Sequence, residues 1–309
     1  MKKPTLHNSA TLVHKNNRHS RHTRLNTMKK IALLASVSLF FAFTNQATAQ
    51  VDGGTNVVKL PSGDKQVTNT TIIPQTQYWL RYYNKLQIND KFMLHTELED
   101  RRYFKPNRAY QTMLPRIHLH YFMGSGWEVL AGFAYFTNTQ PTNTPHQAST
   151  VNVPELRPMV GFEYKQINKR FEINHRYWME ERFQHNYNST SLELSKGYQF
   201  SLRGRYRFQL QYALIRKETA KGTLRFNFSE EIFINIYKGA IINTFDQNRI
   251  FLGLNYGLTR NLILEAGWYK IYQASATTVG TYYNRDVIRV TLTHNMSLKK
   301  TIKKAAEKE

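Results

Sequence analysis

Polar and apolar residues alternate with a period of two along most of the chain after residue 77. In segment 201–214, polar side chains from Ser201 to Gln211 hold every odd position, and apolar residues, aromatic residues or glycine hold the even positions from Leu202 to Tyr212. A strand places these two sets on opposite faces, whereas a helix would scatter them around its axis. The pattern therefore predicts β-strands.

The same alternation predicts about 11 strands. They are expected at 78–86, 91–103, 110–123, 127–137, 153–165, 171–183, 201–214, 223–236, 246–258, 261–273 and 287–294. Most have 9–14 residues, which exceeds the usual strand length of about 5–6 in globular proteins. A tilted strand needs about 9–11 residues to cross a bilayer, so these lengths favour a membrane barrel.

The connections between the expected strands differ in length. Short turns are expected at 88–91, 124–126, 167–169, 217–222 and 258–261, and longer loops at 104–109, 138–152, 184–199, 237–245 and 274–286. Short turns at one rim and longer loops at the other are typical of an outer-membrane β-barrel. The predicted fold class is all-β, an antiparallel up-and-down transmembrane β-barrel of about 10–12 strands within residues 75–296.

The number of strands leaves one expectation open. Single-chain bacterial barrels have even strand numbers, so eleven visible strands imply a missed strand, a strand divided wrongly or a miscounted hairpin. The best candidate for a twelfth strand is 65–73, inside an N-terminal loop segment at 50–74.

A soluble periplasmic ligand-binding barrel would show the same alternation, with the apolar face turned inward. Three features favour the membrane instead: the signs of export described below, the strand length, and several charges per strand, which suit a wide wet lumen. Aromatic residues near strand ends also fit interfacial girdles. They are Tyr78, Trp79, Trp127, Tyr135, Trp178, Trp268 and Tyr272.

The amino-terminal region predicts export. Residues 28–49 contain a basic head at 28–30, an apolar core at 31–43, and a small-x-small triplet that ends at Ala49. These are the three parts of a secretory signal peptide. We expect cleavage between Ala49 and Gln50 and localisation in the cell outer membrane. Residues 1–27 are interpreted as a non-native or disordered leader, and 297–309 as a charged C-terminal tail.

The composition first suggests a nucleic-acid binder, because the formal net charge is +22. Residues 1–49 contribute eight Lys and Arg and no acid, so the mature chain carries +14. With a period of two, Arg203, Arg205 and Tyr206 do not share a face, and the arginines and the tyrosine cannot form one base-stacking platform. Nucleic acid is therefore not an expected partner. The absence of cysteine excludes disulfide and thiol chemistry.

Charged residues gather on the polar strand faces, which would line the lumen. The sixteen candidates are Arg116, Glu155, Arg157, Glu163, Glu172, Arg176, Glu180, Arg182, Arg203, Arg205, Arg207, Arg225, Glu231, Arg249, Glu265 and Arg289. Buried charges must be paired or hydrated. The set predicts either a ladder of Arg–carboxylate bridges that stiffens the wall or a net basic channel that prefers anions. Expected partners are outer-membrane lipid and lipopolysaccharide, the barrel assembly machinery and a small anionic solute.

Other chemistry has weaker support in the sequence. His118 and His120 share a strand face with Arg116, and a His-x-His pair can ligate a metal if a further ligand converges. The sequence assigns no such ligand, so we expect no metal and no cofactor. A barrel-embedded lipid-acting hydrolase would need an activated nucleophile. His95 and Ser229 lie on polar faces, but no nucleophile motif surrounds them, and no enzymatic activity is expected.

Six short segments fall in order along the chain: ELEDRR at 97–102, ELR at 155–157, HRYWMEER at 175–182, RGRYR at 203–207, QNR at 247–249 and NLILEAG at 261–267. Together they resemble the DUF2490 family of bacterial outer-membrane proteins of the Bacteroidetes type, over about 75–296. The resemblance implies an outer-membrane β-barrel and carries no established activity. One departure is the end of the chain, because the charged tail replaces the terminal aromatic residue on which such barrels commonly finish.

Overall fold

The computed structural model describes residues 56–59, 65–68, 70–141, 146–217, 220–239 and 241–298. The expected leader, the signal peptide with its cleavage position, and the tail beyond Leu298 lie outside these residues. The chain divides into two compact units, Met1–Asn69 and Thr70–Glu309. Within the described ranges, no helix has the length and apolar character needed to cross a membrane.

The first unit contains one strand pair. Strands β1 (Asn56–Lys59) and β2 (Lys65–Thr68) are antiparallel and form a two-stranded sheet of their own.

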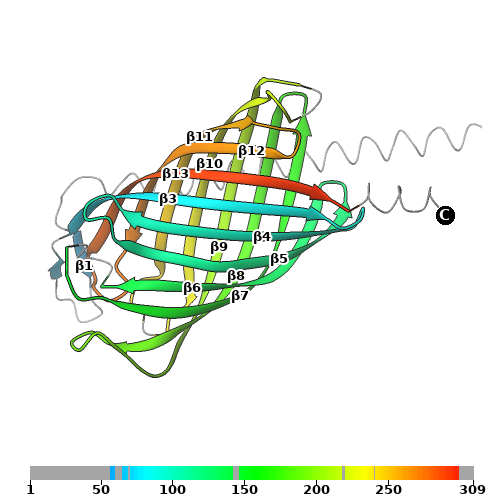
Figure 1. Cartoon of the computed structure of the whole chain (residues 1–309). Coiled ribbons are helices and arrows are strands. Elements are labelled where there is room, and N and C mark those ends of the chain that lie inside the picture. Colours follow the sequence, from blue (N-terminus) through cyan, green and yellow to red (C-terminus); the bar gives the residue numbers. More distant parts are fainter. Residues whose placement is uncertain are drawn as a thin grey trace, which may run out of the picture. The chain divides into compact units, whose positions relative to one another are not determined.

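The second unit is a closed barrel of eleven strands (Figure 1). The strands are β3 (Thr71–Gln87), β4 (Phe92–Tyr103), β5 (Ala109–Gly124), β6 (Trp127–Gln140), β7 (Val151–Asn168), β8 (Phe171–Asn188), β9 (Glu193–Ile215), β10 (Leu224–Tyr237), β11 (Phe245–Gly257), β12 (Leu262–Ala274) and β13 (Thr281–Ser297). Each of them overlaps one strand expected from the alternation of polar and apolar residues. The predicted all-β barrel and its range of strand numbers are confirmed.

The barrel closes in parallel. Every strand is antiparallel to its neighbours along the chain, but β13 runs parallel to β3, with Thr281 opposite Thr71 and Ser297 opposite Gln87. An odd number of up-and-down strands forces this result, because the first and last strands then point the same way. The expected twelfth strand at 65–73 is therefore wrong. Its first part is β2, which pairs with β1 outside the barrel, and its last residues belong to β3.

The connections differ from expectation at two places. The expected loop 274–286 is shorter, because β13 already begins at Thr281. The expected long loop 184–199 is mostly strand, because β8 continues to Asn188 and β9 begins at Glu193. The first eight residues of β9 are all exposed. The alternation is broken here, because 184–186 are all polar and Lys196 interrupts the apolar positions Leu194, Tyr198 and Phe200, so the pattern indicated a loop.

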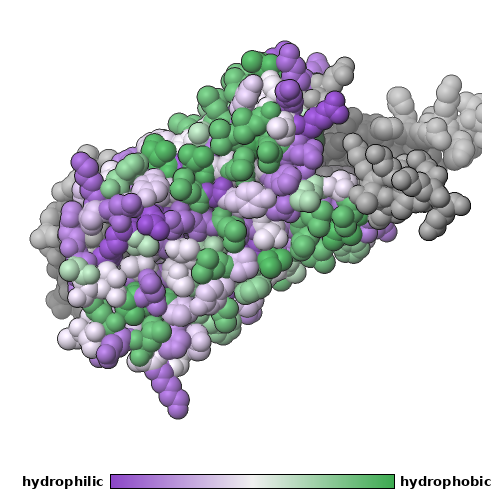
Figure 2. All heavy atoms as spheres, in the orientation of Figure 1, coloured by the Kyte–Doolittle hydropathy of each residue, from purple (hydrophilic) through white to green (hydrophobic). Residues whose placement is uncertain are grey.

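The barrel has a polar inside and an apolar outside. Glu155 and Glu180 in the interior are 0 % exposed, whereas Val160 and Ile236 on the outer wall are 57 % and 55 % exposed. Figure 2 shows patches of apolar side chains on the visible outer face, with polar side chains between them, and ion pairs such as Lys270 with Asp286 also lie on the outside. A soluble barrel has the opposite arrangement, with its apolar residues inside and its polar residues toward water.

Some apolar residues nevertheless fill the interior. One cluster consists of Met113, Leu130, Ala134, Phe136, Met159 and Trp178, and the other of Trp79, Phe251, Tyr269, Ile271 and Val287. Gly161 on β7 gives Trp178 its space, since a Cβ atom at position 161 would lie 2.4 Å from Cδ1 of that indole. Trp79 and Trp178 therefore do not belong to an interfacial girdle. They share strand parity with inward-facing Arg81 and Glu180.

Candidate functional site

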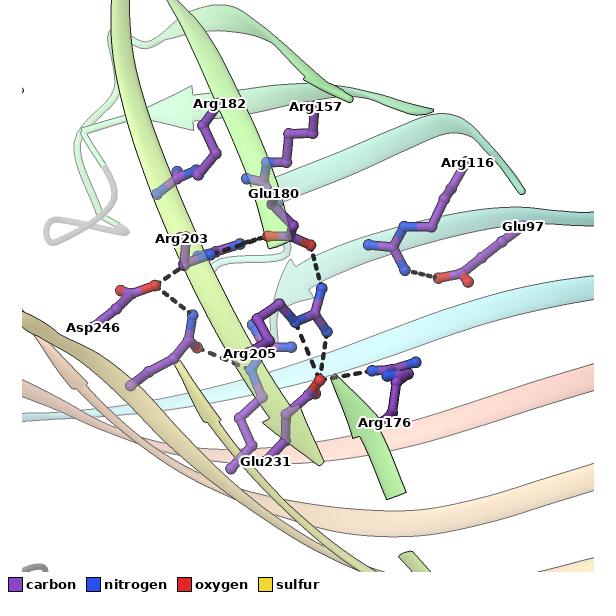
Figure 3. Close-up of polar contacts among 12 residues, drawn as sticks. Glu97, Arg116, Arg157, Arg176, Glu180, Arg182, Arg203, Arg205, Glu231 and Asp246 are labelled. Atoms are coloured by element: carbon purple, nitrogen blue, oxygen red, sulfur yellow. Dashed lines mark hydrogen bonds and ion pairs between the residues drawn. The ribbon is translucent and has the colours of Figure 1, made fainter. Parts of the chain in front are cut away.

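A layer of paired charges crosses the barrel interior (Figure 3). Glu180 of β8 faces Arg203 of β9 in the strand register and accepts a 2.5 Å hydrogen bond from it. Arg205 also donates to Glu180 and makes a second ion pair with Glu231 of β10, at 2.8 Å. Arg176 of β8 donates to the same Glu231 oxygen at 2.6 Å. We call these residues, with Glu155, Arg157, Arg182 and Asp246, the charged layer.

The rest of the charged layer has the same pattern of sharing. Glu155 accepts from Arg157 at 2.7 Å and from Arg182 at 2.6 Å. Arg203 reaches Asp246 of β11 at 2.6 Å with its other terminal nitrogen. Each of the three glutamates of the layer thus meets two arginines, and charge-assisted bonds of this kind are about twice as strong as neutral ones.

Aromatic rings complete the layer. The Arg176 guanidinium lies 3.8 Å from the centroid of Trp178, and that of Arg157 lies 3.9 Å from the centroid of Phe136. Arg205 lies 4.5 Å from the Phe233 ring. Such stacking stabilises a desolvated guanidinium by up to about 2 kcal/mol. Because the planar guanidinium both stacks and forms forked hydrogen bonds, arginine suits this position better than lysine.

The layer fills the middle of the barrel. Its carboxylates at Glu155 and Glu180 are fully buried. The second cavity of the barrel, bounded by members of the layer such as Arg203 and Glu231, has a volume of about 30 Å³. A space of that size holds only a few water molecules. Among the described side chains, the layer therefore narrows the interior at this level.

The structure places all sixteen predicted lumen residues inside the barrel. Some of them lie outside the charged layer: Arg116 donates to Glu97 at 2.7 Å, and Glu265 pairs with Arg289. Glu172 lies 3.8 Å from Lys165 and 3.6 Å from Arg225. The remaining members, Glu163, Arg207 and Arg249, line one or both of the two cavities.

Sequence reasoning missed several interior charges. Glu97, Glu99 and Arg101 follow the same alternation on β4, with Glu99 and Arg101 2.8 Å apart, so the period of two could have found them. Asp246 and Gln247 are adjacent in sequence and both buried. A register shift between Phe233 and Ile234 of the neighbouring strand accompanies this arrangement, and no sequence signal reveals it.

A larger cavity of about 480 Å³ lies toward the end of the barrel with the short turns. Its lining includes Gln87 at the end of β3, Gly257 at the end of β11 and Ile263 near the start of β12. Basic side chains such as Lys85 and Arg207 share the lining with acids such as Glu163. The cavity is thus polar and bears both charges.

Three buried histidines lie together on the wall of this cavity. His95 of β4 stands opposite His118 of β5, and His120 follows two residues later on the same face. One ring nitrogen from each lies within 4.8 Å of the others. Nδ1 of His120 lies 3.4 Å from a carboxylate oxygen of Glu128 on β6. We call the three histidines the histidine cluster.

The histidine cluster has little protein hydrogen bonding. Both ring nitrogens of His118 and of His120, and Nε2 of His95, have no hydrogen-bond partner in the described part of the chain. A buried polar atom without a partner costs about 1–3 kcal/mol. The sequence predicted satisfied histidines because it offered neither a third histidine nor an acid. In the folded chain, the pairing of the strands brings His95 and Glu128 next to His118 and His120.

These features define the class: a closed β-barrel with a charge-rich interior, many apolar side chains on its outer wall and a polar cavity of about 480 Å³. The family model described as "Protein of unknown function (DUF2490)" matches residues 76–283. The match covers more than half of the chain, so the chain belongs to this family, as the six sequence segments predicted. No curated protein matched the chain in a sequence comparison.

Proposed function

We propose that the protein is an outer-membrane β-barrel whose interior is closed by the charged layer. It would act as a membrane-embedded scaffold around the polar cavity, not as an open anion channel. The observation that carries this proposal is the inverted distribution of polarity, with Glu155 and Glu180 fully buried inside and large apolar side chains exposed outside.

The outer wall supports a lipid environment. Soluble monomers expose apolar patches of at most about 300–600 Å², whereas apolar side chains here face outward on every barrel strand, as Val160 and Ile236 do. Stacked aromatic rings lie near both ends of the strands. Trp127 and Tyr164 are 4.5 Å apart by ring centroids at the short-turn end, and Tyr272 and Tyr282 are 4.8 Å apart near the opposite end. Outer-membrane barrels have aromatic residues at both interfaces.

The charged layer favours the bridge ladder over the channel. Arginines that line an anion pathway must be available to passing ions, but Arg203 and Arg205 are buried and bonded to Glu180 and Glu231. The proposed partners of the wall are outer-membrane lipid, lipopolysaccharide and the barrel assembly machinery. Short turns of such barrels face the periplasm, so the cavity would open there. Lys85 and Arg207 on its wall make a small anionic solute the fitting ligand class.

Cell fractionation tests the membrane location. The full chain is expressed in a Gram-negative host, and outer membranes are separated from periplasm. We expect the protein in the outer-membrane fraction, extracted only by detergent, with a gel mobility that changes on heating, because closed barrels resist unfolding by detergent. Recovery of folded protein in the periplasm without detergent would contradict the proposal.

A further inference from the structure

We propose that the histidine cluster binds a divalent first-row transition metal ion of the zinc type. The donors are one ring nitrogen each from His95, His118 and His120. Neutral imidazole suits zinc, copper, nickel and iron, and three histidines with a fourth position left to water form a known type of zinc site. This inference depends on the barrel fold and not on the proposed membrane location.

The distances are close to those of a coordination shell. Zinc–nitrogen bonds of about 2.0–2.1 Å in tetrahedral geometry place two ligand atoms about 3.3 Å apart. The three histidine donors lie within 4.8 Å of one another, somewhat wider than this spacing. Rotation of the imidazole side chains by about 1–2 Å at the donor atoms would complete the shell.

Neighbouring aromatic rings hold two of the histidines in place. Tyr83 meets His95 edge to face, with ring centroids 4.7 Å apart. Trp178 meets His118 in the same manner at 5.0 Å. Since ligands are more effective when packing fixes their orientation, these contacts prepare the two rings for a shared ion. The same packing leaves the ring nitrogens of His118 without a protein partner, as a ligand role requires.

Cations and carboxylates both lie near the histidine cluster. Lys85 of β3 stands opposite His95 in the strand register and opposes a metal ion. Arg116 precedes His118 on the same face, but its guanidinium is bound to Glu97 at 2.7 Å. Glu128 adds a carboxylate beside His120. A carboxylate next to a metal-binding histidine orients the ring and raises its basicity. We therefore assign Glu128 a positioning role next to His120.

Metal titration of the folded full chain tests the proposal. The protein in detergent micelles is stripped with a chelator and titrated with Zn²⁺ by calorimetry and with Co²⁺ by absorption. We expect one high-affinity site and the intense visible bands of tetrahedral Co²⁺. Single variants H95Q, H118Q and H120Q should each weaken that site by more than about 100-fold, and E128Q by about 10–100-fold, the range for outer-shell partners.

A matched control separates this site from other histidines, because the chain has 11 in total. His175 is also buried in a strand but contacts Tyr206 at 3.0 Å, away from the cluster. H175Q should leave Zn²⁺ affinity unchanged. Heat-dependent gel mobility verifies that each variant is folded, and any one folded cluster variant suffices for the test. Unchanged Zn²⁺ affinity in a folded cluster variant, or the absence of tetrahedral Co²⁺ bands in the wild type, would overturn the proposal.

Discussion

At the residue scale, the carboxylates of Glu155 and Glu180 tolerate full burial because each one accepts hydrogen bonds from two arginines. Glu180 accepts from both Arg203 and Arg205, and Arg205 in turn reaches Glu231. Removing ions from water costs several kcal/mol each, and close pairing with additional hydrogen bonds offsets that cost. The charged layer therefore behaves as a unit in which loss of one carboxylate weakens the pairing of two arginines.

The substitution Glu180→Gln tests this sharing. It keeps the shape of the side chain and removes its charge, so Arg203 and Arg205 each lose one of their two anionic partners. We expect the free energy of unfolding to fall by about 3–5 kcal/mol, the usual cost of breaking a buried ion pair. Urea unfolding in lipid vesicles, followed by tryptophan fluorescence, measures the change.

Glu181→Gln is the control for this experiment, because Glu181 is the next residue on β8 and is exposed. Its unfolding midpoint should match that of the wild type. Equal midpoints for Glu180→Gln and the wild type would show that the layer contributes nothing to stability.

The histidine cluster could be predicted only in part from the sequence. Alternation placed His118 and His120 on one face, but it could not bring His95 next to them. That proximity depends on the register between β4 and β5, which is shifted between Glu97 and Glu99. A one-residue slip in register exchanges the two faces of a strand, so a cross-strand cluster cannot be read from one strand alone.

At the element scale, all eleven barrel strands were predictable because each has one buried and one apolar, outward face. The ends were not. The extension of β8 is mostly half-buried and that of β9 is exposed, and the parallel contact between β13 and β3 joins residues about 210 positions apart. Local alternation contains no information on such long-range pairing, which is why the expectation of a twelfth strand was wrong.

Paired cysteines test the parallel closure, and the chain has no cysteine of its own. Leu80 of β3 and Val290 of β13 are direct partners in the parallel register. Neighbouring strands lie about 4.7–4.9 Å apart, within the range that a disulfide spans. The double variant L80C/V290C should therefore form a disulfide under mild oxidation, seen as a shift in non-reducing gel mobility.

A control pair probes the register itself. L80C with I288C places the second cysteine two residues away, since Ile288 is the partner of Tyr78, and the pair should cross-link poorly. Efficient cross-linking in the control but not in L80C/V290C would contradict the register. Failure of both pairs would indicate that another strand separates β3 and β13.

At the scale of the whole molecule, the decisive property is which face of the sheet points inward. A period of two is the same for a soluble barrel and for a membrane barrel, so the sequence left both alternatives open. The closed ring places the charged layer inside and residues such as Leu80 and Val160 outside. The sequence-based arguments from strand length and export agree with this arrangement. The outer-membrane location and the absence of enzymatic activity stay predictions.

Conductance is the most direct test of the central claim, that a membrane-embedded barrel is closed by its charged layer. The full chain is folded and inserted into planar lipid bilayers, with insertion verified by protection from protease. We predict no steady single-channel current from the wild type, because Glu180, Arg203 and their partners fill the interior. Stable, anion-selective channels from properly folded wild-type protein would contradict this account.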